Sequence, residues 1–187
     1  MQAIQQYLSQ LSGNYEDWDV FAEKMEQIDI AKNGLLLKAG QVENYLYFIE
    51  YGLLRFYFEK EEKEITFDFA FEGNFTSAYT SFLTRQPNTY NIQALVKTSI
   101  WRISYNHLQE IYNTTPNGQM VGRIAAEQLF IRKNKREASL LTETAEERYL
   151  NLLKEQPQLI QEIPLKYLSS YIGITPQALS RIRKRIS

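Results

Sequence analysis

The clearest hydrophobic pattern in the chain lies in residues 164–187, where apolar residues recur at the spacing of one helix face in two short segments. They are Leu165, Leu168 and Ile172 in the first segment, and Leu179 and Ile182 in the second. Between the segments, Gly173 suits the left-handed position that ends a helix, Thr175 is a good N-cap and Pro176 suits the first helical position. The pattern predicts two short helices joined by a tight turn, with small Ser169 where they approach.

The outer face of the second predicted helix is polar and basic. It carries Gln177, Ser180, Arg181, Lys184 and Arg185. Side chains of these types hydrogen-bond base edges and phosphates in a DNA major groove. The alternative interpretation is a basic amphipathic helix that only packs and keeps the protein soluble. Because the apolar positions, the glycine and the cap agree in register, we favour a helix-turn-helix.

Residues 28–105 show strand patterns. The segment IDIAKNGLLLKAGQ predicts two strands around a turn at Asn33 and Gly34. A run rich in aromatic and β-branched residues follows from Tyr45, and in its last part apolar and other residues alternate as in a half-buried strand. The apolar positions of that alternation are Ile65, Phe67, Phe69 and Phe71.

Further strands are predicted at Asn91–Val96 and Ile100–Ser104, around a turn at Lys97, Thr98 and Ser99, with a short helix within 75–85. Short strands with close turns are typical of a jelly-roll sandwich or barrel.

Helical patterns flank the strands. Short amphipathic helices are predicted at Ile4–Leu11, Glu16–Met25 and His107–Asn113, and a long helix from Gln119 to about Glu137. A capping box from Thr144 to Glu147 then opens a helix that runs to about Glu155.

The long helix carries a coiled-coil-like stripe formed by Val121, Ile124, Gln128 and Ile131. A stripe of this kind forms either an intramolecular core or the seam of a dimer. The sequence leaves both interpretations open.

Composition sets wide limits. With 187 residues, of which 44% are hydrophobic and 13% aromatic, the chain has enough apolar material for one large or two small domains. The absence of cysteine excludes disulfides, zinc-thiolate sites and cysteine-ligated iron–sulfur clusters. Because no signal peptide and no apolar run of membrane-spanning length is present, we expect a cytoplasmic protein without membrane contact.

The net charge of −1 conceals an asymmetry. Residues 1–129 carry 10 Lys and Arg against 16 Asp and Glu, a net of −6, whereas residues 130–187 carry 11 against 6, a net of +5. A basic end on an acidic body indicates a polyanion-binding segment. The alternative is that the basic residues are solvated helix faces.

Catalytic patterns are absent. His107 is the only histidine, and the chain contains no P-loop, no GxGxxG and no GxSxG. A metal-binding enzyme on a small barrel needs several histidines and a carboxylate. We therefore predict no catalytic residue, no metal site and no enzymatic activity.

The order of barrel, long helix and helix-turn-helix, with the motifs FIEYGLLR and IPLKYLSSYIGITPQALSRIRK, resembles the Crp–Fnr family of transcription regulators. The resemblance implies an α+β fold in three parts. These are a cyclic-nucleotide-binding-like jelly-roll β-barrel with N-terminal helices in 1–117, a dimerisation helix in 118–138, and a helix-turn-helix DNA-binding domain in 139–187.

The resemblance also implies a homodimer that binds a near-palindromic site on double-stranded DNA, with RNA polymerase as a further candidate partner. Thr175, Gln177 and Arg181 match the family's contact positions. Gln177 and Arg181 suit base reading, since Gln pairs with adenine and Arg with guanine, and Ser180, Lys184 and Lys166 suit phosphate contacts. The β-hairpin wing that relatives often carry is not expected here.

The barrel departs from the family pattern for cyclic AMP. In relatives that bind it, a Gly-Glu pair and an Arg-Ser pair hold the ribose and the phosphate. The corresponding residues are Gly73 with Asn74, and Asn88 with Thr89. Nearby Arg85 is a candidate substitute for the missing cation, but we favour the alternative that it is an arginine on the surface of the loop. A buried phosphate without a cation is costly. We therefore expect no cyclic AMP and no other identifiable cofactor, and the effector, if there is one, stays unidentified.

These patterns predict a dimeric DNA-binding transcription regulator whose barrel senses an unknown small ligand or none. The alternative from another class is a ligand-sensing barrel that acts through protein partners without binding DNA. The sequence does not distinguish an activator from a repressor, and it does not name the operator.

Overall fold

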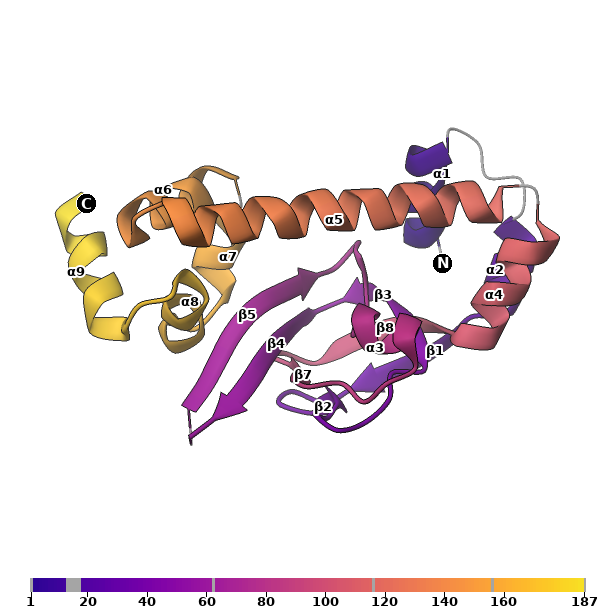
Figure 1. The fold of residues 1–187 in the computed structure, drawn as a ribbon, viewed down its shortest axis with the longest axis horizontal. Coiled ribbons are helices and arrows are strands. Elements are labelled where there is room, and N and C mark those ends of the chain that lie inside the picture. The colour runs from indigo at the N-terminus through magenta and orange to yellow at the C-terminus, as the bar shows by residue number, and fades with distance from the viewer. Residues whose placement is uncertain (1, 13–17, 62, 116, 156, 187) are drawn as a thin grey trace. The chain divides into compact units, whose positions relative to one another are not determined.

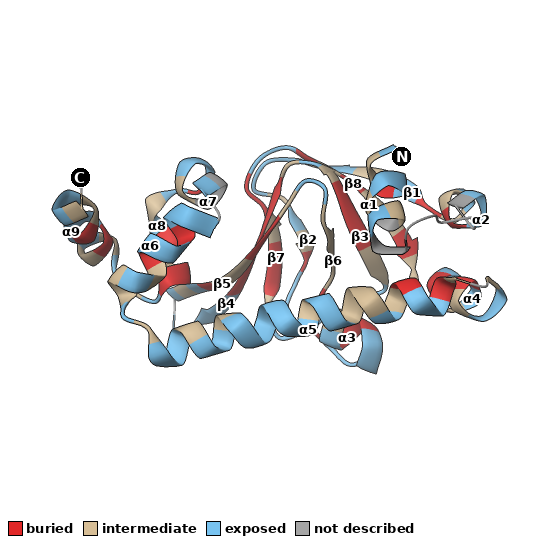
Figure 2. Cartoon of the chain, turned by 90° about the horizontal axis from the view of Figure 1, so that it is seen from above, coloured by how far each residue is buried: buried red, intermediate tan, exposed pale blue. Residues whose placement is uncertain are grey.

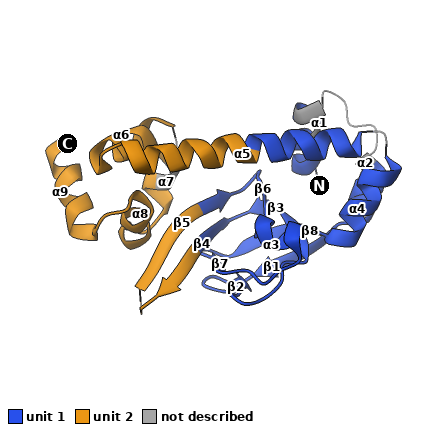
Figure 3. Cartoon of the chain, in the orientation of Figure 1, with its two compact units in different colours: residues 1–56, 69–128 blue, residues 57–68, 129–187 orange. Residues whose placement is uncertain are grey.

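The chain divides into two compact units, each described here by itself. The structure is a computed structural model that describes residues 2–12, 18–61, 63–115, 117–155 and 157–186 (Figure 1). Unit 1 comprises residues 1–56 and 69–128, and unit 2 comprises residues 57–68 and 129–187 (Figure 3).

The described helices are α1 (Gln2–Ser12), α2 (Trp18–Glu23), α3 (Tyr79–Thr84), α4 (Tyr105–Thr114), α5 (Gly118–Thr142), α6 (Ala145–Glu155), α7 (Pro157–Glu162), α8 (Leu165–Ile172) and α9 (Pro176–Ile186). The described strands are β1 (Glu26–Ile30), β2 (Leu35–Leu37), β3 (Tyr45–Tyr51), β4 (Leu53–Lys60), β5 (Lys63–Phe71), β6 (Phe75–Thr76), β7 (Asn91–Ala94) and β8 (Thr98–Ser104). The α+β class predicted from the sequence is confirmed.

The strands form two four-stranded sheets, in the orders β1-β8-β3-β6 and β2-β7-β4-β5. Antiparallel pairing joins β1 to β8 and β3 to β8 in the first sheet, with Ile28 opposite Ile100 and Ile49 also opposite Ile100. Ile49 and Ile100 are fully buried. This arrangement confirms a two-sheet jelly roll.

The first two strands are joined by a turn but do not pair with each other. The turn at Asn33 is present, since Asn33 has a φ of 65° and the Gly34 N–H donates to the Ala31 carbonyl at 2.8 Å. However, β1 pairs with β8, and β2 pairs with β7 in the other sheet. Turn chemistry is local, whereas the choice of partner strand depends on long-range packing.

Two further expectations about strands are wrong in detail. Thr98 and Ser99 begin β8 instead of forming a turn, and Thr98 is fully buried. In β5 the alternation reverses near the start of the strand, because Ile65 is 45% exposed and Thr66 is buried. The reason is that Thr66 contacts α8, a packing partner that the strand's own sequence does not reveal.

The core of unit 1 combines strands with helices from both ends of the unit. One buried cluster of this core contains Ile4, Phe21, Met25, Phe48, Phe82, Ile103, Leu108, Ile111 and Val121. Both predicted N-terminal helices are present, although Glu16, the predicted start of the second, lies outside the described residues. Val121 fills this core and is 8% exposed. It therefore belongs to the intramolecular alternative and not to an exposed seam.

The helices after the barrel follow the predicted capping signals closely. The Thr144 N–H donates to Glu147 Oε2 at 2.7 Å and the Glu147 N–H donates to Thr144 Oγ1 at 3.2 Å, which completes the capping box of α6. The hydrogen bonds that the Thr144 N–H and the Thr144 hydroxyl donate to the Glu147 carboxylate lower the pKa of Glu147. The long helix continues to Thr142, beyond the predicted end near Glu137, and α7 was not predicted.

Gly52 joins β3 of one sheet to β4 of the other. It has a φ of +112°, and a Cβ atom placed on it would lie 2.5 Å from Thr98 Oγ1. Gly40 also has a positive φ, +87°, but a Cβ there would meet nothing within 4 Å. A substitution at Gly40 would therefore introduce backbone strain alone, whereas a substitution at Gly52 would introduce backbone strain and a steric clash.

We expect Gly40→Ala to lower the free energy of unfolding by about 1–2 kcal/mol through backbone strain alone. Gly52→Ala should cost about 1–3 kcal/mol more, because the added methyl group meets buried Thr98. Urea unfolding of the two variants measures the difference. Equal losses would contradict the role assigned to the contact with Thr98.

Candidate nucleic-acid interface

The turn between α8 and α9 is held by backbone hydrogen bonds at Gly173. Gly173 has a φ of 88°, and its N–H donates to the carbonyls of Ser169 and Ser170, both at 3.0 Å. The Ile174 N–H also donates to the Ser169 carbonyl at 3.0 Å. Glycine takes this left-handed conformation without the steric cost of a Cβ atom, so the sequence ends α8 at Ile172.

The first turn of α9 is capped as the sequence predicts. Thr175 Oγ1 accepts a hydrogen bond from the Ala178 N–H at 3.2 Å, and Pro176 is the first helical residue. The capped turn fixes the direction in which α9 leaves Gly173.

The facing surfaces of the two helices are apolar and closely packed. Leu168, Ile172 and Leu179 are fully buried, Ile182 is 9% exposed, and Ser169 is 1% exposed. Small Ser169 leaves room for α9 on the inner face of α8. The buried face leaves the opposite side of α9 free for solvent or a partner.

All six residues predicted to contact DNA are exposed. Five of them lie on α9 or at its cap, namely Thr175, Gln177, Ser180, Arg181 and Lys184, and the sixth, Lys166, lies on α8. The structure therefore brings five of these residues together on one exposed helix face. Lys166 differs from the others because its Nζ forms an ion pair with Glu64 Oε2 at 3.5 Å.

Two arginines that sequence reasoning did not single out hold the carboxyl end of α8. Arg136 of α5 donates from Nη2 to the Tyr171 carbonyl, and its Cζ lies 3.9 Å from the centre of the Tyr171 ring. Arg148 of α6 donates from Nε to the Ile172 carbonyl at 2.9 Å and from Nη1 to the Glu143 carbonyl. Burial lowers the pKa of the Arg136 guanidinium. Cations at this helix end complement its unpaired carbonyls and its dipole.

Other basic residues of unit 2 form ion pairs within the unit. Lys133 pairs with Asp68, Lys135 Nζ with Glu155 Oε2 at 3.0 Å, and Arg185 with Glu146. Arg185, which the sequence placed on the polar face of α9, therefore contacts α6. The positive charge of the C-terminal segment thus divides between internal contacts and the exposed face of α9.

The second half of α5 consists mostly of exposed residues (Figure 2), and several of them are large and apolar. Ile131 is 66% exposed, Phe130 70% and Leu141 80%. Of the residues predicted for a dimer seam, Gln128 and Ile131 are exposed and Ile124 is partly buried. Exposed apolar side chains of this size on one helix are typical of a surface that binds a partner.

The predicted ligand-pocket residues lie in two loops of unit 1. Gly73, with a φ of 77°, and Asn74 form the turn between β5 and β6, where the Gly73 N–H donates to the Ile49 carbonyl at 2.8 Å. Asn88 is buried and donates from Nδ2 to the Tyr90 carbonyl, and Thr89 between them is exposed.

The Arg85 guanidinium contacts other residues of unit 1. It donates to the Glu43 carbonyl at 2.6 Å and to Asn44 Oδ1 at 2.5 Å, and its guanidinium stacks on the Tyr105 ring. These contacts occupy the cation that was the candidate substitute for a phosphate-binding arginine.

Glu43 is buried, and no sequence pattern predicted a buried carboxyl group at this position. Its Oε1 accepts hydrogen bonds from the Tyr45 N–H at 2.9 Å and from the Tyr47 hydroxyl at 2.8 Å. Burial raises the pKa of Glu43, and burial together with the neighbouring Glu43 carboxylate raises the pKa of Tyr47.

The described residues contain no group of three or more His, Asp or Glu side chains placed to hold a metal ion. None of the described helices combines the length and apolar character that a membrane span requires.

Comparison with known proteins finds one family similar to the barrel. Residues 27–115 match the cyclic nucleotide-binding domain family. No curated protein sequence matches the chain.

Several solved structures share the fold of most of this chain. The c-di-GMP-responsive global regulator CLP of Xanthomonas campestris is 16% identical, with 90% of this chain and 89% of that chain covered and a TM-score of 0.71. FixK2 of Bradyrhizobium japonicum is 17% identical, with 87% and 84% covered and a TM-score of 0.71. A Crp/Fnr-family regulator of Eubacterium rectale is 14% identical, with 91% and 86% covered and a TM-score of 0.70.

The resemblance to the Crp–Fnr regulators is thereby confirmed. Residues 27–115 match the cyclic nucleotide-binding domain family, and the chain shares the fold of these solved structures.

The arginine contacts at the end of α8 give a testable expectation. Arg148→Met removes the hydrogen bonds to the Ile172 and Glu143 carbonyls, and we expect it to lower the free energy of unfolding by about 1–3 kcal/mol. Hydrogen exchange of the Gly173 and Ile174 amides should accelerate. Lys154→Met, which also replaces a basic residue with methionine but at an exposed position of α6, is the control. Equal effects of the two would contradict the assignment.

Proposed function

We propose that the chain is a homodimeric, sequence-specific DNA-binding transcription regulator of the Crp–Fnr type. In this proposal α8 and α9 form a helix-turn-helix, and α9 enters the major groove. The observation that carries it is the placement of Thr175, Gln177, Ser180, Arg181 and Lys184 on an exposed surface whose opposite face is fully packed. Residues 139–187 are proposed as the DNA-binding domain, with the barrel in 1–117 and the dimerisation helix in 118–138.

Base reading is assigned to Gln177 and Arg181. Both are exposed and lie four positions apart, one turn along the same side of α9. A glutamine amide bonds adenine at two positions, and a guanidinium bonds guanine at two positions. Ser180, Lys184 and Lys166 supply phosphate contacts, which position the protein without selecting sequence.

Pairing of two chains is assigned to the exposed part of α5. Ile131 with Ile124 and Gln128 forms the proposed seam, and the exposed Phe130 adds apolar surface next to it. Val121 is not part of the proposed dimer seam, because it is buried in the core of unit 1. On a two-fold dimer the two copies of α9 would lie about one DNA turn, roughly 34 Å, apart and would select a near-palindromic site.

The barrel is proposed to respond to a small molecule other than cyclic AMP, or to none. Asn74 and Asn88 make local backbone contacts, and Arg85 is bound to Glu43 and Asn44. Because Arg85 is engaged in this way, the candidate substitute cation is not free to balance the charge of a cyclic phosphate. RNA polymerase is the proposed protein partner of a regulator of this type.

The base-reading assignment is tested with Arg181→Lys, which keeps the positive charge but loses the planar fork of donors. Duplexes enriched from a random-sequence library serve as specific sites. We expect the discrimination between enriched and random duplex to fall by about 1–3 kcal/mol, measured by fluorescence anisotropy. Gln177→Ala should act similarly at an A·T pair.

Lys184→Gln is the control for these variants, since loss of a phosphate contact weakens binding to all sequences alike and reduces the salt slope by about 1. If Arg181→Lys and Gln177→Ala both keep the full discrimination, the reading by α9 is wrong. If the unaltered chain binds no duplex at all, a barrel that acts through protein partners becomes the better account.

The dimer assignment is tested with Ile131→Glu, which places a charge in the proposed apolar seam. Sedimentation equilibrium should show the mass of a dimer for the unaltered chain and of a monomer for the variant, because burying an unpaired charge is costly. Leu150→Glu makes the same type of change at an exposed leucine of α6. A dimer that survives Ile131→Glu, or is lost equally with Leu150→Glu, argues against the seam.

A further inference from the structure

The end of the β4–β5 hairpin belongs to the same compact unit as helices α6 to α9. Residues 57–68 fall in unit 2, although both strands continue into the barrel (Figure 3). A segment of the sensing domain therefore forms part of the body that carries the proposed DNA-reading helix. Its contacts with that body are specific.

Ser170 of α8 joins the helix to the hairpin. The Thr66 N–H donates to Ser170 Oγ at 2.9 Å, and Ser170 Oγ donates to the Glu64 carbonyl at 3.4 Å. Thr66 is 1% exposed, so this contact is shielded from water. The pair of bonds fixes the backbone of residues 64–66 against the outer side of α8.

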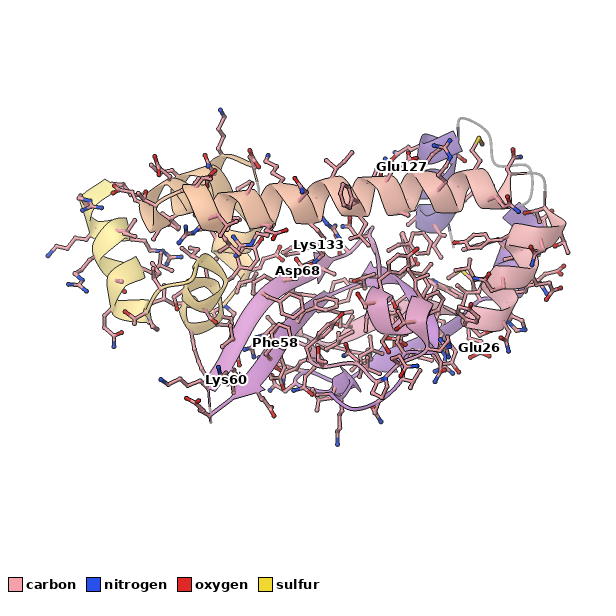
Figure 4. The ribbon with its side chains drawn as sticks, in the orientation of Figure 1. Glu26, Phe58, Lys60, Asp68, Glu127 and Lys133 are labelled. Atoms are coloured by element: carbon pink, nitrogen blue, oxygen red, sulfur yellow. The ribbon has the colours of Figure 1, made fainter. Side chains whose placement is uncertain are left out.

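A second contact ties the hairpin to α5. Lys133 and Asp68 form an ion pair, and Figure 4 shows their side chains directed toward each other from α5 and β5. The Lys133 ammonium also lies 5.7 Å from the centre of the Phe67 ring, which packs on Phe58 with the ring centres 4.8 Å apart. Two anchored points limit rotation of the hairpin about either one.

This docking brings Glu64 to a proposed phosphate contact. Glu64 Oε2 lies 3.5 Å from Lys166 Nζ, with side-chain exposures of 31% for Glu64 and 69% for Lys166. Because Ser170 holds the Glu64 backbone, the carboxylate stays within reach of Lys166. Residues 59–64 carry four glutamates and two lysines, so the nearby charge is also negative.

We propose that Glu64 limits the affinity of the DNA-binding unit for DNA, because it competes with a DNA phosphate for Lys166. The proposal rests on the function proposed above. A lysine–phosphate contact strengthens binding to every sequence equally, whereas Gln177 and Arg181 discriminate between sequences. Partial neutralisation of Lys166 therefore lowers the affinity for every duplex by a similar factor, and the discrimination between sequences stays with Gln177 and Arg181.

The size of the effect follows from the exposure of the pair. An exposed ion pair contributes little to stability, so removal of the Glu64 charge should leave the fold intact. Toward a polyanion the same removal frees one full positive charge. Each phosphate neutralised by a cation adds about 0.9 to the magnitude of the slope of log affinity against log salt.

The experiment measures the affinity of the full chain for a fluorescent random-sequence duplex over a range of salt concentrations. The variants are Glu64→Gln, Lys166→Gln and the double variant. Glu59→Gln, which removes the same charge from an exposed position of the same hairpin, is the matched control. Thermal unfolding confirms that each variant is folded.

We expect Glu64→Gln to bind random duplex about 2- to 5-fold more tightly than Glu59→Gln does, the fold-change that matches the usual strength of an exposed ion pair. Its salt slope should be steeper by up to about 0.9. In the background of Lys166→Gln, the effect of Glu64→Gln should fall to that of Glu59→Gln, because the partner of the carboxylate is gone.

Equal effects of Glu64→Gln and Glu59→Gln on affinity would overturn the proposal. They would show that any negative charge on the hairpin repels DNA to the same extent. An effect of Glu64→Gln that persists without Lys166 would also overturn it. In both cases the unaltered chain still binds DNA, so the proposed function survives. Absence of duplex binding in the unaltered chain and in every variant would overturn the proposed function and this proposal together.

Discussion

The carbonyl end of α8 is the point on which the proposed reading surface depends. A helix leaves its last carbonyls without intrahelical partners, and here they lie beside the turn that sets the direction of α9. Gly173 and Ile174 return their N–H groups to the carbonyls of α8, and Arg136 and Arg148 bond the Tyr171 and Ile172 carbonyls. Loss of either set of bonds would free α9 to rotate about Gly173.

This constraint explains why the basic segment is only partly a binding surface. Arg136 and Arg148 lie in the segment with a net charge of +5, yet both bond backbone carbonyls. Lys133 and Lys135 are paired with carboxylates. What remains exposed on α9, above all Arg181 and Lys184, is a small and well-defined group. A polyanion is bound best by a surface of this kind when two copies act together, which gives the exposed part of α5 its proposed role.

Local signals made the helices near the C-terminus predictable. The register of Leu168 with Leu179, the turn at Gly173 and the cap at Thr175 each report on a few neighbouring residues, and the structure confirms all three. Long-range pairing was not predictable in the same way. The partner of β1 is β8, far along the chain, and no feature of the turn at Asn33 indicates it.

The contacts between the hairpin and α8 lie beyond sequence patterns for the same reason. Thr66 reads as a solvent-facing residue of a half-buried strand, but it is buried because Ser170, distant in sequence, lies against it. From the sequence, Arg148 is likewise indistinguishable from the other charged residues of an amphipathic helix. The identity of the ligand-pocket residues remains a prediction, since their function depends on a molecule that the amino-acid pattern does not name.

Methylation protection on a duplex enriched from a random library tests the central claim most directly, because dimethyl sulfate reacts with guanine N7 in the major groove. The account predicts two clusters of protected guanines about 10 base pairs apart, both lost in Arg181→Lys while the protein still binds. Protection absent from the major groove, or unchanged when Arg181 is replaced by lysine, would contradict the placement of α9 in the groove.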